Sequence, residues 1–351
     1  MRRLVAVLLA LTLAACAPML RQQALTPSAD FQGPRLEADT VVSFDGARLG
    51  LTLWPAEGEP WAVIVAAHGM NDYAGAFHLA APAWAKAGVT TYAYDQRGFG
   101  RSPQRGVWGG EALMTEDLRT VTALVRARHP QAVITVVGES MGGSVAVAAF
   151  ASDRPPAADR LILLSPGVWG FRTQPLAYKT ALWLAAHVTA AKVYTPPRWV
   201  TSRVSPTDNR EELIAMGRDP LMIWGARSDT LYGLVKLMSR ASRAVGHDRV
   251  PTLYLYGAHD DIIPKKAAVR AARGLTASDR SAYYDAGHHL LTRDHQRAVV
   301  IADVLAFLGD PARALPSGAP AILPVQPQKL LIPAPGTDER SARGKAPAGT
   351  Q

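Results

Sequence analysis

Residues 133–143 read Val-Ile-Thr-Val-Val-Gly-Glu-Ser-Met-Gly-Gly, and this stretch decides the fold. Its first half is a run of apolar, mostly β-branched residues, which predicts a buried strand ending at Gly138. Its second half opens a segment rich in glycine, alanine and serine, which predicts a closely packed helix. A strand, a sharp turn and a helix around G-x-S-x-G form the context of a nucleophile elbow. We therefore expect Ser140 to lie in a strained turn at a helix N-terminus, as a candidate nucleophile.

Apolar strands alternate with helices on both sides of this stretch. Residues 40–44 and 48–54 flank Asp45-Gly46 and predict a leading hairpin. We expect a helix over residues 115–129 with Thr115 as its N-cap. The alternation predicts an α/β fold with a mostly parallel central sheet and helices on both faces. We predict further strands over residues 61–67, 89–94, 161–164, 250–256 and 281–284, and further helices over residues 79–87, 228–245, 265–273 and 296–308.

One domain is expected over residues 37–309, and its alternation of strands and helices is interrupted at about residues 167–225. That segment holds several tryptophans and a long apolar stretch, which predicts an inserted helical cap over the strand ends. Residues 16–36 are rich in alanine, glutamine and proline and predict a linker that tethers the domain to the membrane. Residues 310–351 are dominated by proline, alanine and glycine without periodicity, which predicts a disordered tail.

Residues 1–15 have the layout of a signal peptide. Arg2 and Arg3 precede a short apolar run that small residues follow, and the run is too short to span a bilayer. Residues 13–16, Leu-Ala-Ala-Cys, resemble a bacterial lipobox, which implies that a lipidated Cys16 becomes the mature N-terminus. Ala17 in place of aspartate implies a lipid anchor in the outer membrane, with the domain at its periplasmic face. The alternative is an ordinary secretory signal with an incidental cysteine.

Composition narrows the classes of partner. Cys16 is the only cysteine, so an internal disulfide is excluded. The formal net charge of +9 falls to +7 without Arg2 and Arg3. The sequence has no basic block with interleaved aromatic residues, so we do not expect it to bind nucleic acid. No metal-ligand cluster or nucleotide-binding loop stands out, so we expect neither a metal nor a cofactor. The oligomeric state is left open.

A serine nucleophile needs a base, and the base needs an acid that orients it. In a sheet of this kind these residues follow Ser140 in the order acid then histidine, each just past a strand. Asp260 or Asp261 can supply the acid, and His288 or His289 the base; spacing alone leaves both choices open.

Backbone amides are expected to stabilise the oxyanion that forms during ester cleavage. The amide of Met141 directly follows the nucleophile, and the amide of Met70 lies in the loop after the strand over residues 61–67. His68 at the end of that strand is expected to shape the oxyanion loop rather than to act as a base. Asp95 and Arg97 are expected to be loop scaffolding.

Several motifs occur together in one order. They are His-Gly-Met-Asn-Asp-Tyr at 68–73, Asp-Gln-Arg-Gly-Phe-Gly-Arg-Ser at 95–102, Gly-Glu-Ser-Met-Gly-Gly at 138–143, Gly-Ala-His-Asp at 257–260, and His289 two residues before Leu291. This set resembles the monoacylglycerol lipase and lysophospholipase group of α/β-hydrolases, also described as serine-aminopeptidase-like. The resemblance implies Asp260 as the acid and His289 as the base. Two departures are Glu139, where histidine is frequent, and Asn71-Asp72, where a Gly-Glu pair is common.

This resemblance implies a serine hydrolase that cleaves carboxylic esters of monoacylglycerols or lysophospholipids through an acyl-enzyme, and the lipobox-like residues 13–16 imply that it is lipid-anchored. A second hypothesis keeps Ser140, Asp260 and His289 but makes the protein a transacylase, or an amidase or aminopeptidase. A third makes it a non-catalytic, lipid-binding scaffold of the envelope.

Overall fold

The computed structural model describes residues 19–323, apart from residues 198, 200 and 201. The predicted signal peptide and Cys16 lie outside the described residues, as do residues 324–351 of the predicted tail. Among the described residues, no helix is both long enough and apolar enough to cross a bilayer.

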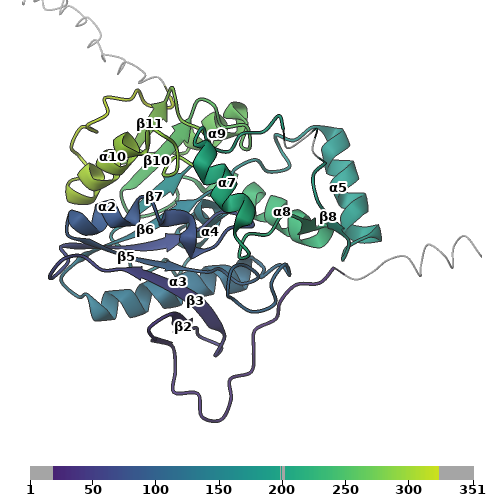
Figure 1. Ribbon diagram of the computed structural model, residues 1–351, viewed down its shortest axis with the longest axis horizontal. Coiled ribbons are helices and arrows are strands. Elements are labelled where there is room, and N and C mark those ends of the chain that lie inside the picture. The colour runs from purple at the N-terminus through teal and green to yellow at the C-terminus, as the bar shows by residue number, and fades with distance from the viewer. Residues whose placement is uncertain (1–18, 198, 200–201, 324–351) are drawn as a thin grey trace, which may run out of the picture.

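A nine-stranded sheet forms the centre of the molecule (Figure 1), in the order β1-β2-β3-β5-β4-β6-β7-β10-β11. Strands β1, β2, β3 and β5 pair antiparallel, and β5, β4, β6, β7, β10 and β11 pair parallel. The predicted leading hairpin is therefore confirmed. The strands are β1 Arg35–Leu36, β2 Thr40–Val42, β3 Arg48–Trp54, β4 Ala62–Ala67, β5 Val89–Tyr94, β6 Val133–Glu139, β7 Arg160–Leu164, β10 Thr252–Gly257 and β11 Arg280–Tyr284.

Helices cover both faces of the sheet, and each face has its own buried core. One core joins the sheet to α3 Glu111–Arg128, α4 Met141–Phe150, α8 Ser228–Ala244 and α9 Lys265–Ala272. The other joins it to the 3₁₀ turn η1 Ala74–Phe77, α2 Ala81–Lys86 and α10 Arg297–Gly309. The predicted α/β architecture is confirmed.

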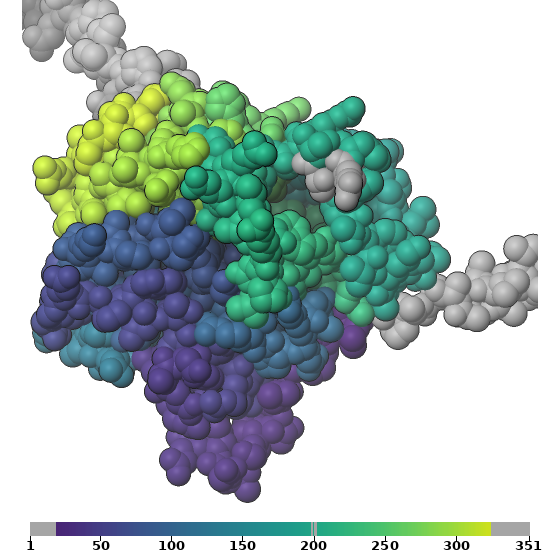
Figure 2. All heavy atoms as spheres, viewed as in Figure 1, coloured from purple at the N-terminus to yellow at the C-terminus, as the bar shows by residue number. Residues whose placement is uncertain are grey.

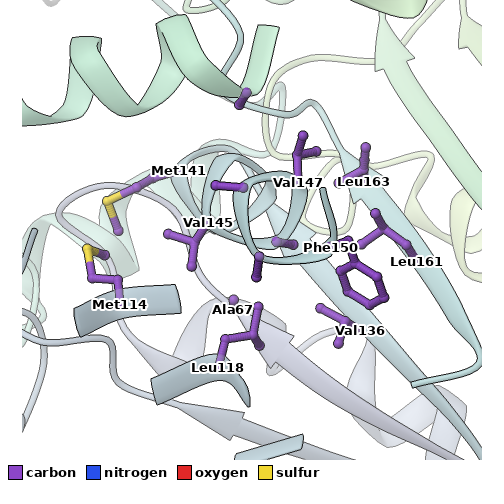
Figure 3. Packing of buried hydrophobic residues seen from close by; sticks show 14 of the residues in the cluster. Ala67, Met114, Leu118, Val136, Met141, Val145, Val147, Phe150, Leu161 and Leu163 are labelled. Carbon is purple, nitrogen blue, oxygen red and sulfur yellow. The ribbon is translucent and has the colours of Figure 1, made fainter. Parts of the chain in front are cut away.

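Helix α4, which follows the elbow, is buried along its whole length. Its small residues let it approach the strands closely, and its larger ones fill the space between α3 and the sheet (Figure 3). The labelled contacts are Met141, Val145, Val147 and Phe150 of α4, Met114 and Leu118 of α3, and Ala67, Val136, Leu161 and Leu163 of the sheet.

Helix α3 begins four residues before the predicted start, so the assignment of Thr115 as its N-cap is wrong. The chain enters α3 at Gly110, whose φ of 81° suits glycine. The Thr115 hydroxyl instead donates to the Ala112 carbonyl inside the helix, at 3.2 Å. A threonine followed by acidic residues has the pattern of a cap, but here that pattern lies in the second turn.

Between β7 and α8 the chain leaves the sheet. This segment contains α5 Leu176–Val188 and α7 Arg210–Arg218, together with the short antiparallel pair β8 Val193–Tyr194 and β9 Ala226–Arg227. Helix α7 is capped by Asn209, whose side chain accepts a hydrogen bond from the Glu212 amide at 3.2 Å. We refer to residues 166–227 as the cap.

The part of the predicted tether that the structure describes, residues 19–36, is mostly exposed but is fixed to the domain by hydrogen bonds at several points. The Gln22 amide donates to the Trp108 carbonyl at 2.8 Å, and the Gln22 side chain donates to the carbonyls of Pro103 and Val107, both at 3.1 Å. Gln22 is 4% exposed. Because extended chain is held here by single hydrogen bonds, its sequence carries no periodic signal. We call residues 19–25 the strap.

The predicted disordered tail is wrong where it can be followed, at residues 310–323. The Tyr283 amide donates to the Pro320 carbonyl at 2.8 Å, and the Ile322 amide donates to the Ser281 hydroxyl at 3.2 Å. Ile322 is buried against the core. A proline-rich extended segment can thus cover the edge strand β11 although its composition resembles that of a disordered chain.

Candidate active site

Ser140 lies between the end of β6 and the first residue of α4, as predicted from the motif. Its φ of 50° and ψ of −114° are unusual for a residue with a side chain, so the backbone is strained there. The flanking glycines are required by close packing: a Cβ at Gly142 would collide with the Ala67 carbonyl, and one at Gly138 would lie 2.6 Å from the Gly143 Cα. Strand, strain and glycines together place Ser140 at the N-terminus of α4.

The loop after β4 lies directly beside Ser140. A Cβ at Gly69 would lie 3.3 Å from the Ser140 Cβ. Met70 follows Gly69, and Met141 is the first residue of α4, where amides have no partner within the helix. The two expected oxyanion donors, the amides of Met70 and Met141, thus belong to segments that meet at Ser140.

Asp260 and His289 form a buried pair at the same edge of the sheet. His289 Nδ1 lies 2.8 Å from Asp260 Oδ2, and Asp260 Oδ1 accepts the amides of Ile262 and Ile263 at 2.9 and 2.8 Å. Because a carboxylate accepts, Nδ1 carries the proton and Nε2 is the basic nitrogen. Burial lowers the pKa of His289, but the Asp260 charge and hydrogen bond outweigh it and raise the pKa above the ordinary value.

The two alternative residues are not part of this pair. Asp261 is exposed, and its carboxylate accepts the Ser205 amide at 3.3 Å. The ring of His288 stacks on His259, with 5.3 Å between the ring centroids. Among the described residues, no hydrogen bond joins the Ser140 hydroxyl to His289. Such bonds commonly tighten only when substrate is bound.

His68 is fully buried and both of its ring nitrogens are engaged. Nδ1 lies 2.7 Å from the Gly69 carbonyl, and Nε2 accepts the Gln96 amide at 2.9 Å. A carbonyl can only accept and an amide can only donate, so the ring is neutral. Burial also lowers the pKa of His68. These contacts hold the oxyanion loop against the loop after β5.

A buried cluster of charges lies beneath Ser140. Glu139, directly before the nucleophile, is fully buried, and its Oε1 accepts a hydrogen bond from Arg293 Nη2 at 2.9 Å. The same Nη2 donates to Asp72 of the oxyanion loop, and Arg293 Nη1 lies 3.7 Å from Glu212 Oε1 of α7. A single guanidinium therefore joins the elbow, the oxyanion loop, the cap and the loop that carries His289.

The cluster sets the electrostatics around His289. Burial raises the pKa of Glu139 and Arg293 opposes that rise, whereas burial lowers the pKa of Arg293 and its carboxylate neighbours raise it above the ordinary value. The Glu139 charge also raises the pKa of His289, and the Arg293 charge lowers it. Glu139 thus acts on His289 in the same direction as Asp260.

Sequence reasoning did not identify Arg293, Asp72 or Glu212 as neighbours. Glu139 gave the one usable signal, because a carboxylate at the end of a buried strand needs a cation. Nothing in the pattern shows that this cation comes from Arg293, which lies 154 residues further along the chain.

The cap also contacts the oxyanion loop directly. The Ile223 amide donates to the Asn71 carbonyl at 3.0 Å, and the Tyr73 hydroxyl donates to Asp219 at 2.6 Å. Asn71 has a φ of 65°, a left-handed conformation that asparagine tolerates. Residues that differ from the common motif, Asn71 and Asp72, therefore make the contacts that join this loop to the cap and to Arg293.

One group of side chains beside the pair has the composition of a cation site. Ligand atoms of Asp208, His288 and Asp294 lie within 4.8 Å of one another. Hydrogen bonds within the loops already engage both carboxylates, since Asp208 accepts the His295 amide at 2.8 Å and Asp294 accepts the His288 amide at 2.7 Å. We attribute these contacts to support of the loop that carries His289.

An apolar groove of about 550 Å³ opens in the cap between α5 and α8. Figure 2 shows the face of the molecule on which the surface is hollowed over α8, between α7 and α5. The residues that line the groove are Phe171, Lys179, Thr180, Trp183, Leu184 and Tyr232.

Similarity to known proteins covers most of the domain. The chain is 26% identical over 278 residues to a monoacylglycerol lipase of Mycolicibacterium smegmatis, which covers 75% of this chain and 93% of the relative. It is 24% identical to the human monoglyceride lipase, which covers 74% of this chain and 86% of that protein.

Solved structures show the same fold. A soluble variant of the Saccharomyces cerevisiae monoglyceride lipase superposes with a TM-score of 0.67 at 17% identity, over 83% of this chain and all of that one. A thermostable carboxyl esterase from Bacillus coagulans gives a TM-score of 0.63 at 18% identity, over 77% of this chain and 96% of that one. Residues 58–296 match the family model described as serine aminopeptidase, S33. With an elbow serine, a buried Asp–His pair and this match, the chain belongs to the serine aminopeptidase S33 family of α/β-hydrolases.

Proposed function

We propose that this protein is a serine hydrolase that cleaves carboxylic esters of lipids, with monoacylglycerols or lysophospholipids as substrates. The observation that carries the proposal is the buried Asp260–His289 pair, with its 2.8 Å contact, at the sheet edge where Ser140 occupies a strained elbow. The relatives named as monoacylglycerol lipases and the apolar groove of the cap support a substrate with an acyl chain.

The reaction begins with attack of the Ser140 hydroxyl oxygen on the ester carbonyl, while His289 Nε2 takes the hydroxyl proton. Asp260 holds Nδ1 and stabilises the imidazolium that forms. The amides of Met70 and Met141 donate to the oxyanion. Collapse of the tetrahedral intermediate breaks the bond to the alcohol, which leaves with the proton from His289. Water, deprotonated by His289, then attacks the acyl-enzyme and releases the fatty acid and Ser140.

The lipidation of Cys16 and a place at the periplasmic face of the outer membrane are part of this proposal. The lipobox-like sequence Leu-Ala-Ala-Cys at residues 13–16 supports them. The acyl groups implied by that motif anchor a protein stably where a single chain gives only reversible binding.

The experiment compares ester and amide turnover by the full chain in detergent. The substrates are p-nitrophenyl esters of rising chain length, monoacylglycerol, lysophospholipid and aminoacyl amides. Ser140→Ala is the test variant, and Ser152→Ala, just past the far end of α4, is the matched control. We expect turnover that peaks on a long-chain lipid ester, persists in Ser152→Ala and disappears in Ser140→Ala.

The other outcomes separate the alternatives. Preference for aminoacyl amides would indicate an amidase, and transfer of the acyl group to an added alcohol in place of water would indicate a transacylase. Folded wild-type protein that neither turns over any substrate nor reacts with a fluorophosphonate would indicate the non-catalytic scaffold.

A further inference from the structure

Exposed apolar side chains gather at one end of the molecule. Leu176, Trp183 and Leu184 of α5 are 73%, 50% and 53% exposed, and Val193 and Tyr194 of β8 are 57% and 41% exposed. In Figure 1 these two elements lie at the right, at the opposite end from α10. A group of exposed apolar side chains at one end of a protein indicates an interaction site. We call the exposed side chains of α5 and β8 the apolar end.

The sequence around the apolar end is basic. Residues 166–205 contain five lysine or arginine residues and no aspartate or glutamate. Lys192 lies over the ring of Tyr194, with its Nζ 5.2 Å from the ring centroid, so one of these cations lies within the apolar end itself. Apolar and aromatic side chains mixed with cations match the chemistry of an anionic membrane surface.

The strap is hydrogen-bonded to the start of α8, which is in turn bonded to the residues between α5 and β8. The Leu20 amide donates to Asp229 Oδ2 at 3.0 Å. Asp229 in turn donates its own amide to the carbonyl of Ala190, just past α5, at 3.1 Å. The carbonyl of Lys192, next to β8, accepts the Ser228 amide at 3.2 Å. Gln22 then fixes the strap through its three hydrogen bonds to the loop at residues 103–108.

The position of Leu20 limits where an anchor at Cys16 can lie. Four residues separate the two, and fully extended chain spans at most about 3.6 Å per residue, so the anchor lies within roughly 14 Å of Leu20. A flexible tether over residues 16–36 would have allowed several times that distance. A bilayer that holds the acyl groups therefore lies within this distance of Leu20, which is bonded to Asp229 at the start of α8.

We propose that the strap holds the anchored enzyme in one orientation, with the apolar end seated on the anionic bilayer that contains the Cys16 acyl groups. The inference rests on the proposed lipidation of Cys16 and is independent of the hydrolytic chemistry. In this orientation the groove between α5 and α8 opens at the membrane, where lipid esters are found.

Depth-resolved fluorescence quenching tests the orientation. Cys16 is the only cysteine, and the proposed acylation blocks its thiol, so one introduced cysteine can be labelled selectively. Leu184→Cys reports on the apolar end. Val299→Cys on α10, where the native side chain is also exposed at 40%, is the matched control. The lipidated full chain is reconstituted into vesicles of phosphatidylethanolamine and phosphatidylglycerol that carry nitroxide-labelled acyl chains.

We expect the label at position 184 to lose most of its fluorescence and the label at position 299 to keep it. Equal quenching at both positions would overturn the proposal. So would shielding of position 184 that depends on protein concentration in detergent without vesicles, because that result would show that a second copy covers the apolar end.

Removal of the hydrogen bonds that hold the strap tests whether the strap sets the orientation of the enzyme on the membrane. Gln22→Ala removes the two side-chain hydrogen bonds, and Gln23→Ala, at an exposed neighbour, is the matched control. We expect Gln22→Ala to reduce quenching at position 184 and to slow turnover of vesicle-embedded monoacylglycerol, while turnover of a short soluble ester stays unchanged. Quenching in Gln22→Ala equal to that in Gln23→Ala would contradict a role for the strap. If the wild type itself did not turn over the short ester, that result would instead count against the proposed function.

Discussion

Two buried arginines, Arg97 and Arg293, are each surrounded by carboxylates, but they serve different parts of the molecule. Arg97 forms two hydrogen bonds to Asp45 and two to Asp117, at 2.6 to 2.9 Å. It thereby joins the leading hairpin to α3. The planar guanidinium of Arg97 thus donates four hydrogen bonds to two carboxylates, and this is the geometry of a structural support.

Arg293 is less completely paired. One nitrogen, Nη2, serves both Asp72 and Glu139, and Nη1 is 3.7 Å from the nearest Glu212 oxygen. Its Nε has no partner among the described residues. The segments that it joins are those that must align for catalysis. Incomplete pairing of a buried charge is energetically costly. In this molecule it is found at Arg293, beside the candidate nucleophile, and not at Arg97.

The largest expected effect is the loss of turnover when Asp260 is replaced, and the effects of the two arginine clusters can be compared with it. Asp260→Asn leaves a side chain of the same shape but removes the charge that orients His289. We expect kcat to fall by about 10⁴-fold, as for the equivalent change in a serine protease triad. The measurement is kcat on a short-chain ester, with circular dichroism to verify folding. A fall of less than tenfold would mean that Asp260 does not orient the base.

Replacement of Arg293 is expected to reduce both stability and turnover. Arg293→Met leaves Glu139 and Asp72 buried without a cation, which costs about 3–5 kcal/mol in the free energy of unfolding. We also expect kcat of the folded fraction to fall, since the loop of His289 loses its contact with the elbow. Urea unfolding and active-site titration separate the two effects.

A double variant sharpens this result. Because Glu139→Gln removes one of the uncompensated charges, Arg293→Met combined with Glu139→Gln should be more stable than Arg293→Met alone. Equal stability of the two would show that Glu139 and Arg293 are not coupled.

Replacement of Arg97 is expected to reduce stability alone. Arg97→Met leaves Asp45 and Asp117 unpaired in the interior, so the free energy of unfolding should fall by about 3–5 kcal/mol. Turnover for each active site that a fluorophosphonate titrates should equal that of the wild type. A change in kcat similar to that of Arg293→Met would remove the distinction between the two clusters.

The smallest expected effect is a shift in pH dependence. Hydrolysis needs neutral His289, so activity falls as the pH drops through its pKa, which lies above the ordinary value. Glu139 contributes to that rise. Glu139→Gln should therefore lower the pKa of His289 and move the acid limb of kcat/KM to lower pH. A shift to higher pH, or none, would contradict the coupling between Glu139 and His289.

The parts of the site that sequence could predict are those that local rules determine. Ser140 was identified because a strand, glycines and a small-residue helix surround it. Asp260 and His289 lie just past consecutive parallel strands, where the chain order of such sheets leads one to expect them. Spacing could not choose between neighbours, and the choice came from resemblance; the structure pairs Asp260 with His289.

The parts that sequence could not predict depend on long-range contacts without periodicity. Arg293 meets Asp72 across 221 residues, and no pattern links them. The strap and residues 310–323 have the composition of linkers, yet the three hydrogen bonds of Gln22 and the hydrogen bond to the Pro320 carbonyl hold them on the domain. Composition reports the lack of a helical or strand period, and it does not report whether an extended chain is bound.

Direct detection of the acyl-enzyme tests the central claim, that Ser140 attacks lipid esters. The full chain in detergent is mixed with a monoacylglycerol, quenched in acid within one turnover and digested for peptide mass spectrometry. We predict that the peptide that contains Ser140 gains the mass of the fatty acid less one water, and that no such adduct forms in Ser140→Ala. Steady hydrolysis without this adduct, or an adduct on another residue, would contradict the account.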